Sequence, residues 1–404
     1  MKKTKYDILV LLIIVINVFY ISSSATGTAF ANNEIKNGLN SSENIIFDQL
    51  DQLDLENLQK EIDKINRQKK DYLPELKMKE VIKDFLKGNI ELGEEKLLKN
   101  ILKTLAGEVT SNLNILGQII ILSVISSILK VFYNSFQGQR ISQTANLLIF
   151  LVLSVLVLQS FHLAIDIGVN TVDLMASFMR ALLPVLLTLL VSMGAISSAI
   201  IFQPITFLLI SFLVTIIKSI IFPLIFISCV LFIVDEISSE IKISRLAGVF
   251  RELSIGLLGL TLMSFISWLL IKGGAAAVAD SLSLRTAKFL TGAIIPVIGG
   301  IFTDAVDLII SCSLIIKNAL NFFGVIVILV IIIYPLIKLA ALIIIYKLAA
   351  ALLEPISEDK LAGILNKVAN NLILILIVVL TVAFMFFIVI TILAGTANLS
   401  VMMR

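Results

Sequence analysis

LILILIVVLTVAFMFFIVITIL, residues Leu372–Leu393, is a run of 22 residues without a charged side chain. A helix needs about 20 consecutive apolar residues to cross the hydrocarbon core of a bilayer. Long apolar runs of this kind recur along the chain, at Leu116–Phe132, Leu147–Ile165, Ala181–Phe202, Ile205–Val234 and Ile255–Ile271. The sequence therefore predicts an all-α fold, a polytopic transmembrane helical bundle.

The composition supports a membrane protein. Of the 404 residues, 58% are hydrophobic and only 15% are charged, and the mean hydropathy is +1.03. Soluble proteins carry about 25% charged residues. The net charge of +3 is too balanced to predict nucleic-acid binding. Cys229 and Cys312 lie far apart in apolar runs and are expected to be buried free thiols, and the single histidine, His162, excludes a multi-histidine metal site within this chain.

The first 31 residues have the pattern of a secretory signal peptide. Three lysines in the first five residues precede the apolar run Ile8–Ile21, and Ala29-Phe30-Ala31 supplies a small-x-small cleavage pattern. The alternative is an uncleaved first transmembrane helix. Cleavage after residue 31 would place the following segment outside the cytoplasm.

Residues 32–112 form the polar part of the chain and are expected to be an extracytoplasmic, amphipathic helical region. Apolar residues recur there at helical spacing among many charges; they are Leu50, Leu53, Leu58, Ile62 and Ile65, then Met78, Val81, Ile82, Phe85 and Leu86, then Leu97, Leu98, Ile101, Leu102 and Leu105. Each apolar face is either the core of a small helical domain or a contact surface for a partner or the membrane.

Residues 113–404 are expected to be the multi-pass transmembrane domain, with about 7–9 spans, some of them broken or re-entrant. The apolar region 308–353 is interrupted by lysines and crosses about one to three times. Segments 130–146 and 272–304 are expected in the cytoplasm, and segments 166–180, 235–254 and 354–371 outside. Helix breaks are expected at four prolines: Pro184, Pro204, Pro223 and Pro335.

Two lysines at membrane depth are candidate functional residues. Lys218 lies within Ile205–Val234, and Lys338 lies within the apolar region that ends near residue 353. A charge in hydrocarbon is costly, so it usually faces a bundle interior or a wet cavity. Each lysine therefore lines a pathway or a subunit contact, or else snorkels to the interface. For Lys347 the snorkelling interpretation is favoured.

The segment FLTGAIIPVIGGIFTD, Phe289–Asp304, is a further candidate site. Its apolar core is too short to span a bilayer, and Pro296 with Gly299 and Gly300 makes a continuous helix unfavourable. Broken backbone at membrane depth occurs where protein buries it or water reaches it. The segment, including Asp304, is either a re-entrant element at a pathway or subunit contact, or a surface loop.

No motif for catalysis is present. The sequence contains no G-x-x-x-x-G-K-[ST] loop, no H-E-x-x-H and no G-x-S-x-G elbow. We expect a protein that is not an enzyme and holds no cofactor or metal.

Several fragments, in their order along the chain, resemble the stage III sporulation protein AE family of endospore-forming bacteria. They are DYLPE at 71–75, LLPVLL at 182–187, FQP at 202–204, RTAKF at 285–289, IPVIGG at 295–300 and LEPI at 353–356. The resemblance implies a membrane subunit of a channel complex that links the mother cell with the engulfed forespore and is needed for late forespore gene expression. It implies a place in the mother-cell membrane around the forespore, and partners that include other subunits of that complex and a separate ATPase. We also expect contact with the lipid bilayer, a homo-oligomer and no nucleic acid.

Two other functions stay open. A self-contained secondary transporter for a small solute would also use broken helices and charges at membrane depth. A membrane scaffold without a conducting path fits the same residues. The sequence does not identify a solute or a stoichiometry.

Overall fold

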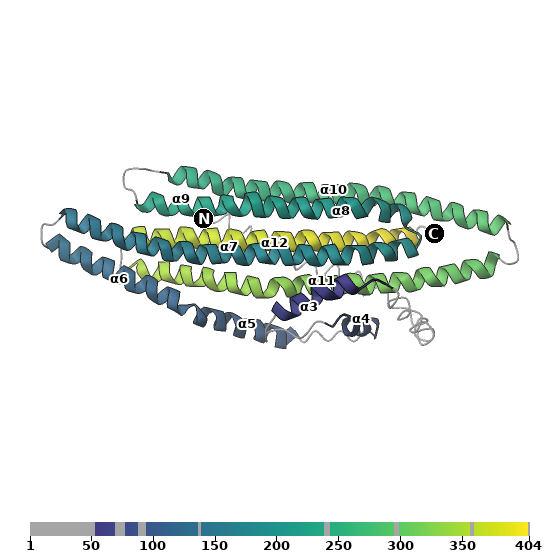
Figure 1. Cartoon of the computed structure of the whole chain (residues 1–404), viewed down its shortest axis with the longest axis horizontal. Helices are drawn as coiled ribbons and strands as arrows, with labels where there is room; N and C mark the ends of the chain where they lie inside the picture. Colours follow the sequence, from purple (N-terminus) through teal and green to yellow (C-terminus); the bar gives the residue numbers. More distant parts are fainter. Residues whose placement is uncertain are drawn as a thin grey trace.

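The chain folds into a bundle of long helices, as the sequence predicts (Figure 1). The structure is a computed structural model and describes residues 53–68, 77–87, 94–135, 139–237, 243–294, 299–355 and 359–402. Every regular element in these ranges is a helix. The expected signal peptide, residues 1–31, lies outside them.

The long helices are α6 to α12. They are α6 (Leu113–Ser135), α7 (Gln139–Ser192), α8 (Ile196–Ile216), a π-turn (Ile217–Ile221), α9 (Phe222–Ile237), α10 (Ser244–Ile294), α11 (Gly299–Leu353) and α12 (Asp359–Met402). Figure 1 shows α8 and α10 along one side of the bundle, α3 and α5 along the opposite side, and α7, α11 and α12 between them.

The described residues contain fewer candidate spans than the sequence indicates. Among the described residues five helices are long and apolar enough to cross a membrane: Leu148–Ser192, Ile196–Glu236, Ser244–Ile271, Ile309–Leu353 and Leu361–Gly395. A sixth results if the pair Lys99–Ser111 and Leu113–Ile128, bent by 40°, counts as one span. The prediction of 7–9 spans is therefore too high, because single helices run through segments that hydropathy divides into two spans.

The largest correction concerns α7. Segment 166–180, expected to be an external loop, lies inside this helix, and Val172, Met175 and Phe178 there are fully buried. The chain instead turns at Gly194, within the expected span Ala181–Phe202, where φ is 80° and glycine is the residue that adopts this backbone most readily. Apolar residues flank the turn on both sides, so hydropathy does not reveal it.

The expected helix breaks at the four prolines are not found. Helices continue through Pro184, Pro204 and Pro335. Pro223 follows a π-turn in which the Phe222 N–H donates to the Ile217 carbonyl, five residues earlier. Proline is tolerated in membrane helices where neighbouring helices and local π-turns compensate for the lost hydrogen bond.

The three N-terminal helices pack on the bundle rather than on one another. They are α3 (Glu56–Gln68), α4 (Met78–Lys87) and α5 (Glu94–Ser111); α3 contacts α7, and α4 and α5 contact α11. The side chains of Leu58, Ile62 and Ile82 are fully buried, and the rings of Phe85 and Phe322 lie 4.8 Å apart. The apolar faces of α3 and α4 therefore cover the chain's own long helices, whereas Leu102 of α5 is 64% exposed.

The centre of the bundle is packed closely at two glycines. A Cβ at Gly168 of α7 would lie 2.8 Å from the Phe222 ring, and a Cβ at Gly324 of α11 would lie 2.7 Å from Leu182 of α7. The same Cβ at Gly324 would be 3.1 Å from Ile390 of α12. Absence of a side chain at these positions lets α7, α11 and α12 approach one another, as small residues do between membrane helices. The two cysteines are free and buried, as predicted.

Candidate functional site

Lys218 has a partner within the chain. It lies in the π-turn between α8 and α9, and its Nζ donates to Oδ2 of Asp173 on α7 at 2.6 Å. The side chains of Lys218 and Asp173 are 35% and 44% exposed. The pair ties α7 to the α8–α9 helix within two candidate spans. π-turns are often found at functional positions.

Lys338 belongs to a different cluster. Its Nζ lies 4.7 Å from the centre of the Tyr334 ring, one turn earlier on α11. The Tyr334 hydroxyl donates to Oε1 of Glu108 at 3.1 Å, which connects α11 to α5. A cation over an aromatic ring is stabilised electrostatically, so the Lys338 ammonium group interacts with the Tyr334 ring as well as with solvent.

Lys317 was not selected from the sequence. Only 1% of it is exposed, and its Nζ donates to the carbonyl of Ala394 on α12 at 2.9 Å. One turn further along α11, the amide of Asn321 is buried and has no hydrogen-bond partner among the described residues. A single lysine followed by an asparagine four residues later in an apolar run is the signal that would have identified this position.

The end of α9, the start of α10 and the first part of α12 carry a polar network. Lys367 of α12 donates to Glu236 at 2.5 Å and lies 3.8 Å from Asp235. Oδ1 of Asp235 accepts the backbone N–H groups of Ile243 and Ser244 at 2.8 Å each, and so caps the start of α10. These contacts fasten the α9–α10 connection to α12.

Lys347, one and a half turns before the end of α11, is exposed and contacts two amides of α12. Its Nζ donates to Asn366 at 2.6 Å and to Asn370 at 3.0 Å. These bonds join α11 to α12 near the connection between them.

The predicted segment 289–304 falls at the junction of α10 and α11. α10 ends at Ile294, and Gly299, Gly300 and Asp304 lie in the first two turns of α11. Pro296 is outside the described residues, so the choice between a re-entrant element and a surface loop stays a prediction. Asp304 and Lys338 belong to one continuous helix and are separated along it by about 51 Å, at 1.5 Å per residue. The candidate residues therefore do not form a single site.

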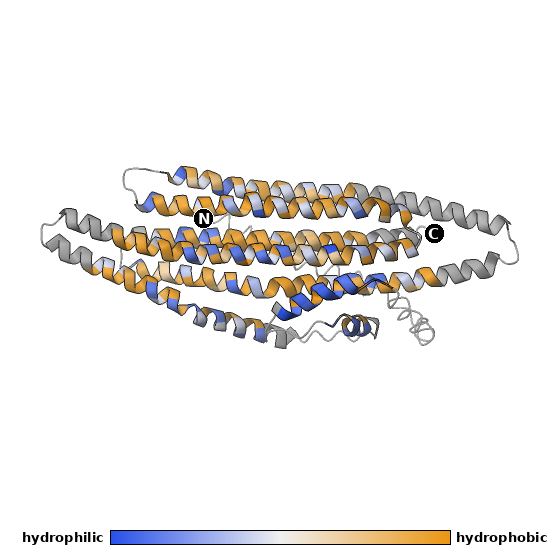
Figure 2. Cartoon of the chain, viewed as in Figure 1, coloured by the Kyte–Doolittle hydropathy of each residue, from blue (hydrophilic) through white to orange (hydrophobic). Residues whose placement is uncertain are grey.

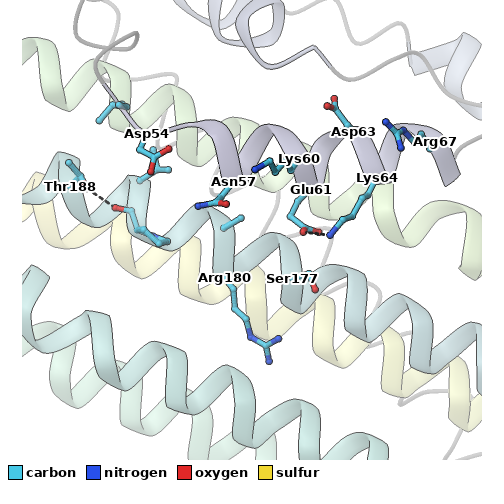
Figure 3. Close-up of a pocket in the computed structure, with 14 residues that line it drawn as sticks. Asp54, Asn57, Lys60, Glu61, Asp63, Lys64, Arg67, Ser177, Arg180 and Thr188 are labelled. Atoms are coloured by element: carbon cyan, nitrogen blue, oxygen red, sulfur yellow. Dashed lines mark hydrogen bonds and ion pairs between the residues drawn. The ribbon is translucent and has the colours of Figure 1, made fainter.

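A charged groove lies between α3 and α7 (Figure 3). Its volume is about 810 Å³, and the polar residues lining it are Asp54, Asn57, Lys60, Glu61, Asp63, Lys64, Arg67, Ser177, Arg180 and Thr188. Lys64 and Glu61 form an ion pair at 2.6 Å within α3. Figure 3 shows Arg180 directed away from α3.

The groove is lined by acidic and basic side chains together. In the described ranges, His, Cys, Asp and Glu side chains form no group of three that could hold a metal ion. On the same α3, the hydrogen bond and charge of Lys60 lower the pKa of Glu56, so this carboxylate stays ionised at neutral pH.

Two comparisons relate the chain to known proteins. A family model described as Stage III sporulation protein AE matches residues 76–397, which include every candidate span. A Bacillus subtilis (strain 168) protein named "Stage III sporulation protein AE" is 37% identical over 332 residues, which cover 82% of this chain and 83% of that protein. No solved structure matches.

Proposed function

This chain belongs to the stage III sporulation protein AE family, and we propose that it is a membrane subunit of a channel complex that links the mother cell with the forespore. The observation that carries the proposal is the extent of the match. Residues 76–397 take in the whole bundle and two of its N-terminal helices, α4 and α5, so the likeness concerns the architecture and not an isolated motif.

The length of the helices favours a subunit of a larger assembly. α7, α10 and α11 contain 54, 51 and 55 residues, which is about 77–83 Å at 1.5 Å per residue. The hydrocarbon core of a bilayer is about 30 Å thick. The bundle must therefore extend well beyond the hydrocarbon, and the projecting helix ends offer surfaces to other subunits.

The proposal includes a place and partners. The chain sits in the mother-cell membrane around the forespore, with residues 32–112 outside the cytoplasm. It acts in copies of itself and with the other subunits of the stage III complex. It is not an enzyme, and a separate ATPase supplies energy, which agrees with the lack of a P-loop in the sequence.

A clean deletion of the gene in its native host tests the proposal. Engulfment is scored by membrane staining and late forespore gene expression by a fluorescent reporter, with the wild-type gene at a second locus as control. We expect arrest after engulfment with silent late genes, restored by the second copy. Normal spores together with a growth or uptake defect would refute the proposal.

The competing function, a self-contained transporter, has its own test. The purified chain is reconstituted alone into liposomes and supplied with labelled small solutes. Uptake of one defined solute without partners would replace the channel-subunit proposal with the transporter.

A further inference from the structure

Polar side chains recur along one accessible face of α7. Successive polar residues are three or four positions apart, which keeps their side chains on one face of the helix. One interval is eight residues long, and the exposed Pro184 lies at its midpoint. We call this set the polar stripe; it consists of His162, Asp166, Asn170, Asp173, Ser177, Arg180 and Thr188. All seven are exposed or half-exposed.

The polar stripe is long on the scale of a bilayer. From His162 to Thr188 it covers about 39 Å of helix, and the hydrocarbon core is about 30 Å thick. All of it lies within the candidate span Leu148–Ser192. It includes the ion pair of Asp173 with Lys218 at 2.6 Å, and the imidazole of His162 lies 3.6 Å from the carboxylate of Asp166.

The side of the bundle away from α3 exposes an apolar surface (Figure 1). On α8, Leu208 is 71% exposed and Phe212 is 59% exposed, and on α10 Met263 and Ile271 are exposed as well. Trp268 of α10 joins Leu208 and Phe212 around an apolar hollow of about 290 Å³. A contiguous apolar surface on candidate spans requires a cover, and lipid is the cover that its chemistry fits.

The apolar surface and the polar stripe lie at the same height. α7 and α8 are antiparallel helices joined at the turn that contains Gly194, and Arg180 and Leu208 are each 14 residues from this glycine. The groove brings α3 to this height too, because Asn57 and Lys60 line it together with Arg180. Figure 2 shows hydrophilic colouring along α3 and hydrophobic colouring along α8.

Lipid at this height therefore covers the α8–α10 surface and cannot cover the surface formed by α3 and the polar stripe. Charges exposed to hydrocarbon are costly, and they are found facing the interior of an assembly or a water-filled cavity. The charged side chains of α3 and of the polar stripe are hydrated only if water reaches them at this depth.

We propose that the polar stripe of α7 and the outer face of α3 line a water-filled path within the membrane, while lipid covers the α8–α10 side. This inference rests on the proposed function and assigns the lining of the path to named residues. The solutes it suits are small and polar, of either charge, because the groove carries acidic and basic side chains together.

Cysteine accessibility tests the path. Ser177→Cys on the polar stripe and Asn57→Cys on α3 are compared with Leu208→Cys on the apolar side at the same height. Membranes from sporulating cells are opened by freeze–thaw and treated with a charged, membrane-impermeant thiosulfonate. The native Cys229 and Cys312 are buried, so the unsubstituted chain supplies the background.

We expect both cysteines of the path to react roughly tenfold or more faster than Leu208→Cys, since a thiol in apolar surroundings is not ionised and the reagent does not enter lipid. Labelling after denaturation confirms equal amounts of each variant. Fast reaction of Leu208→Cys would mean that this height lies outside the bilayer, and slow reaction of all three would mean that the stripe is dry. Either result overturns the path.

The labelling result is independent of the sporulation phenotype. A dry stripe in a strain whose deletion arrests sporulation would refute the path and leave the proposed function standing. Fast labelling of the path cysteines, together with normal sporulation of the deletion mutant, would refute the proposed function and leave the path standing.

Discussion

Breaking the ion pair between Lys218 and Asp173 should destabilise the bundle, and breaking it from both sides should cost less than the two single changes together. The pair has a short contact of 2.6 Å, and its side chains are 35% and 44% exposed. Exposed pairs contribute about 0.2–1 kcal/mol, and removal of one partner of a fully buried pair costs about 3–5 kcal/mol. At this intermediate exposure, Lys218→Leu or Asp173→Leu should cost roughly 1–3 kcal/mol.

The cost of each single change includes the charge left without a partner. The double variant Lys218→Leu/Asp173→Leu leaves none, so we expect it to recover much of the loss, with a coupling energy of roughly 1–2 kcal/mol. Unfolding of the purified protein in mixed micelles is followed by the fluorescence of Trp268, the one tryptophan of the chain, as the detergent composition is changed.

A matched control is present on α3. Lys60 and Glu56 are also 2.6 Å apart, but the pair is well exposed, so Lys60→Leu should leave the transition unchanged. Single variants at Lys218 and Asp173 as stable as this control, with an additive double variant, would refute the argument that the membrane-depth pair stabilises the bundle. Each variant is also tested for sporulation. A double variant that regains stability but not sporulation would indicate a role for the charges beyond stability.

Three further outcomes are expected. Gly324→Val should lower the free energy of unfolding by about 1–3 kcal/mol, because an added Cβ meets a neighbouring side chain at 2.7 Å. Gly256→Val, with nothing within 4 Å of its Cβ, should change that free energy by less than about 1 kcal/mol. Thermal melting in detergent distinguishes the two variants, and equal losses would contradict close packing at Gly324. Lys317→Met should be as stable as the parent or more stable, since it replaces a buried amino group by an apolar chain of similar shape. A loss above about 2 kcal/mol in the same melting assay would show that the bond of Lys317 to α12 is needed. Ile62→Asp should release α3 from α7 and speed tryptic cleavage within residues 53–68, because the Ile62 side chain is fully buried. The control Lys64→Gln should not speed cleavage. Equal cleavage rates, after allowing for the tryptic site that Lys64→Gln removes, would mean that α3 is not held by its apolar face.

The sequence identified the faces of the N-terminal helices but not what they pack on. The spacing of Leu58 and Ile62 is sufficient to indicate an apolar side, since 3.6 residues make one turn. The spacing of apolar residues shows which face of a helix is apolar, but it does not show which other helix packs on that face. The partner is α7, more than 100 residues further along the chain.

The candidate residues divide in the same way. Lys218 was found from its position in an apolar run, because a charge there is costly wherever the helix packs. The sequence does not reveal its partner Asp173, which is 45 positions away in segment 166–180, a segment whose polarity predicts a loop. Lys317 was passed over because its burial depends on α12, which covers it only in the folded bundle.

Amino-acid order alone determined that this chain is a helical membrane protein, because the cost of apolar surface in water and of unpaired backbone in lipid depends on composition and run length. It also determined the family, through fragments spread over the whole bundle. Tertiary structure decided where the helices turn, how many of them span, and which charges meet. Those features depend on how distant segments pack and where the chain turns, as at Gly194, which brings Arg180 of α7 and Leu208 of α8 to one height.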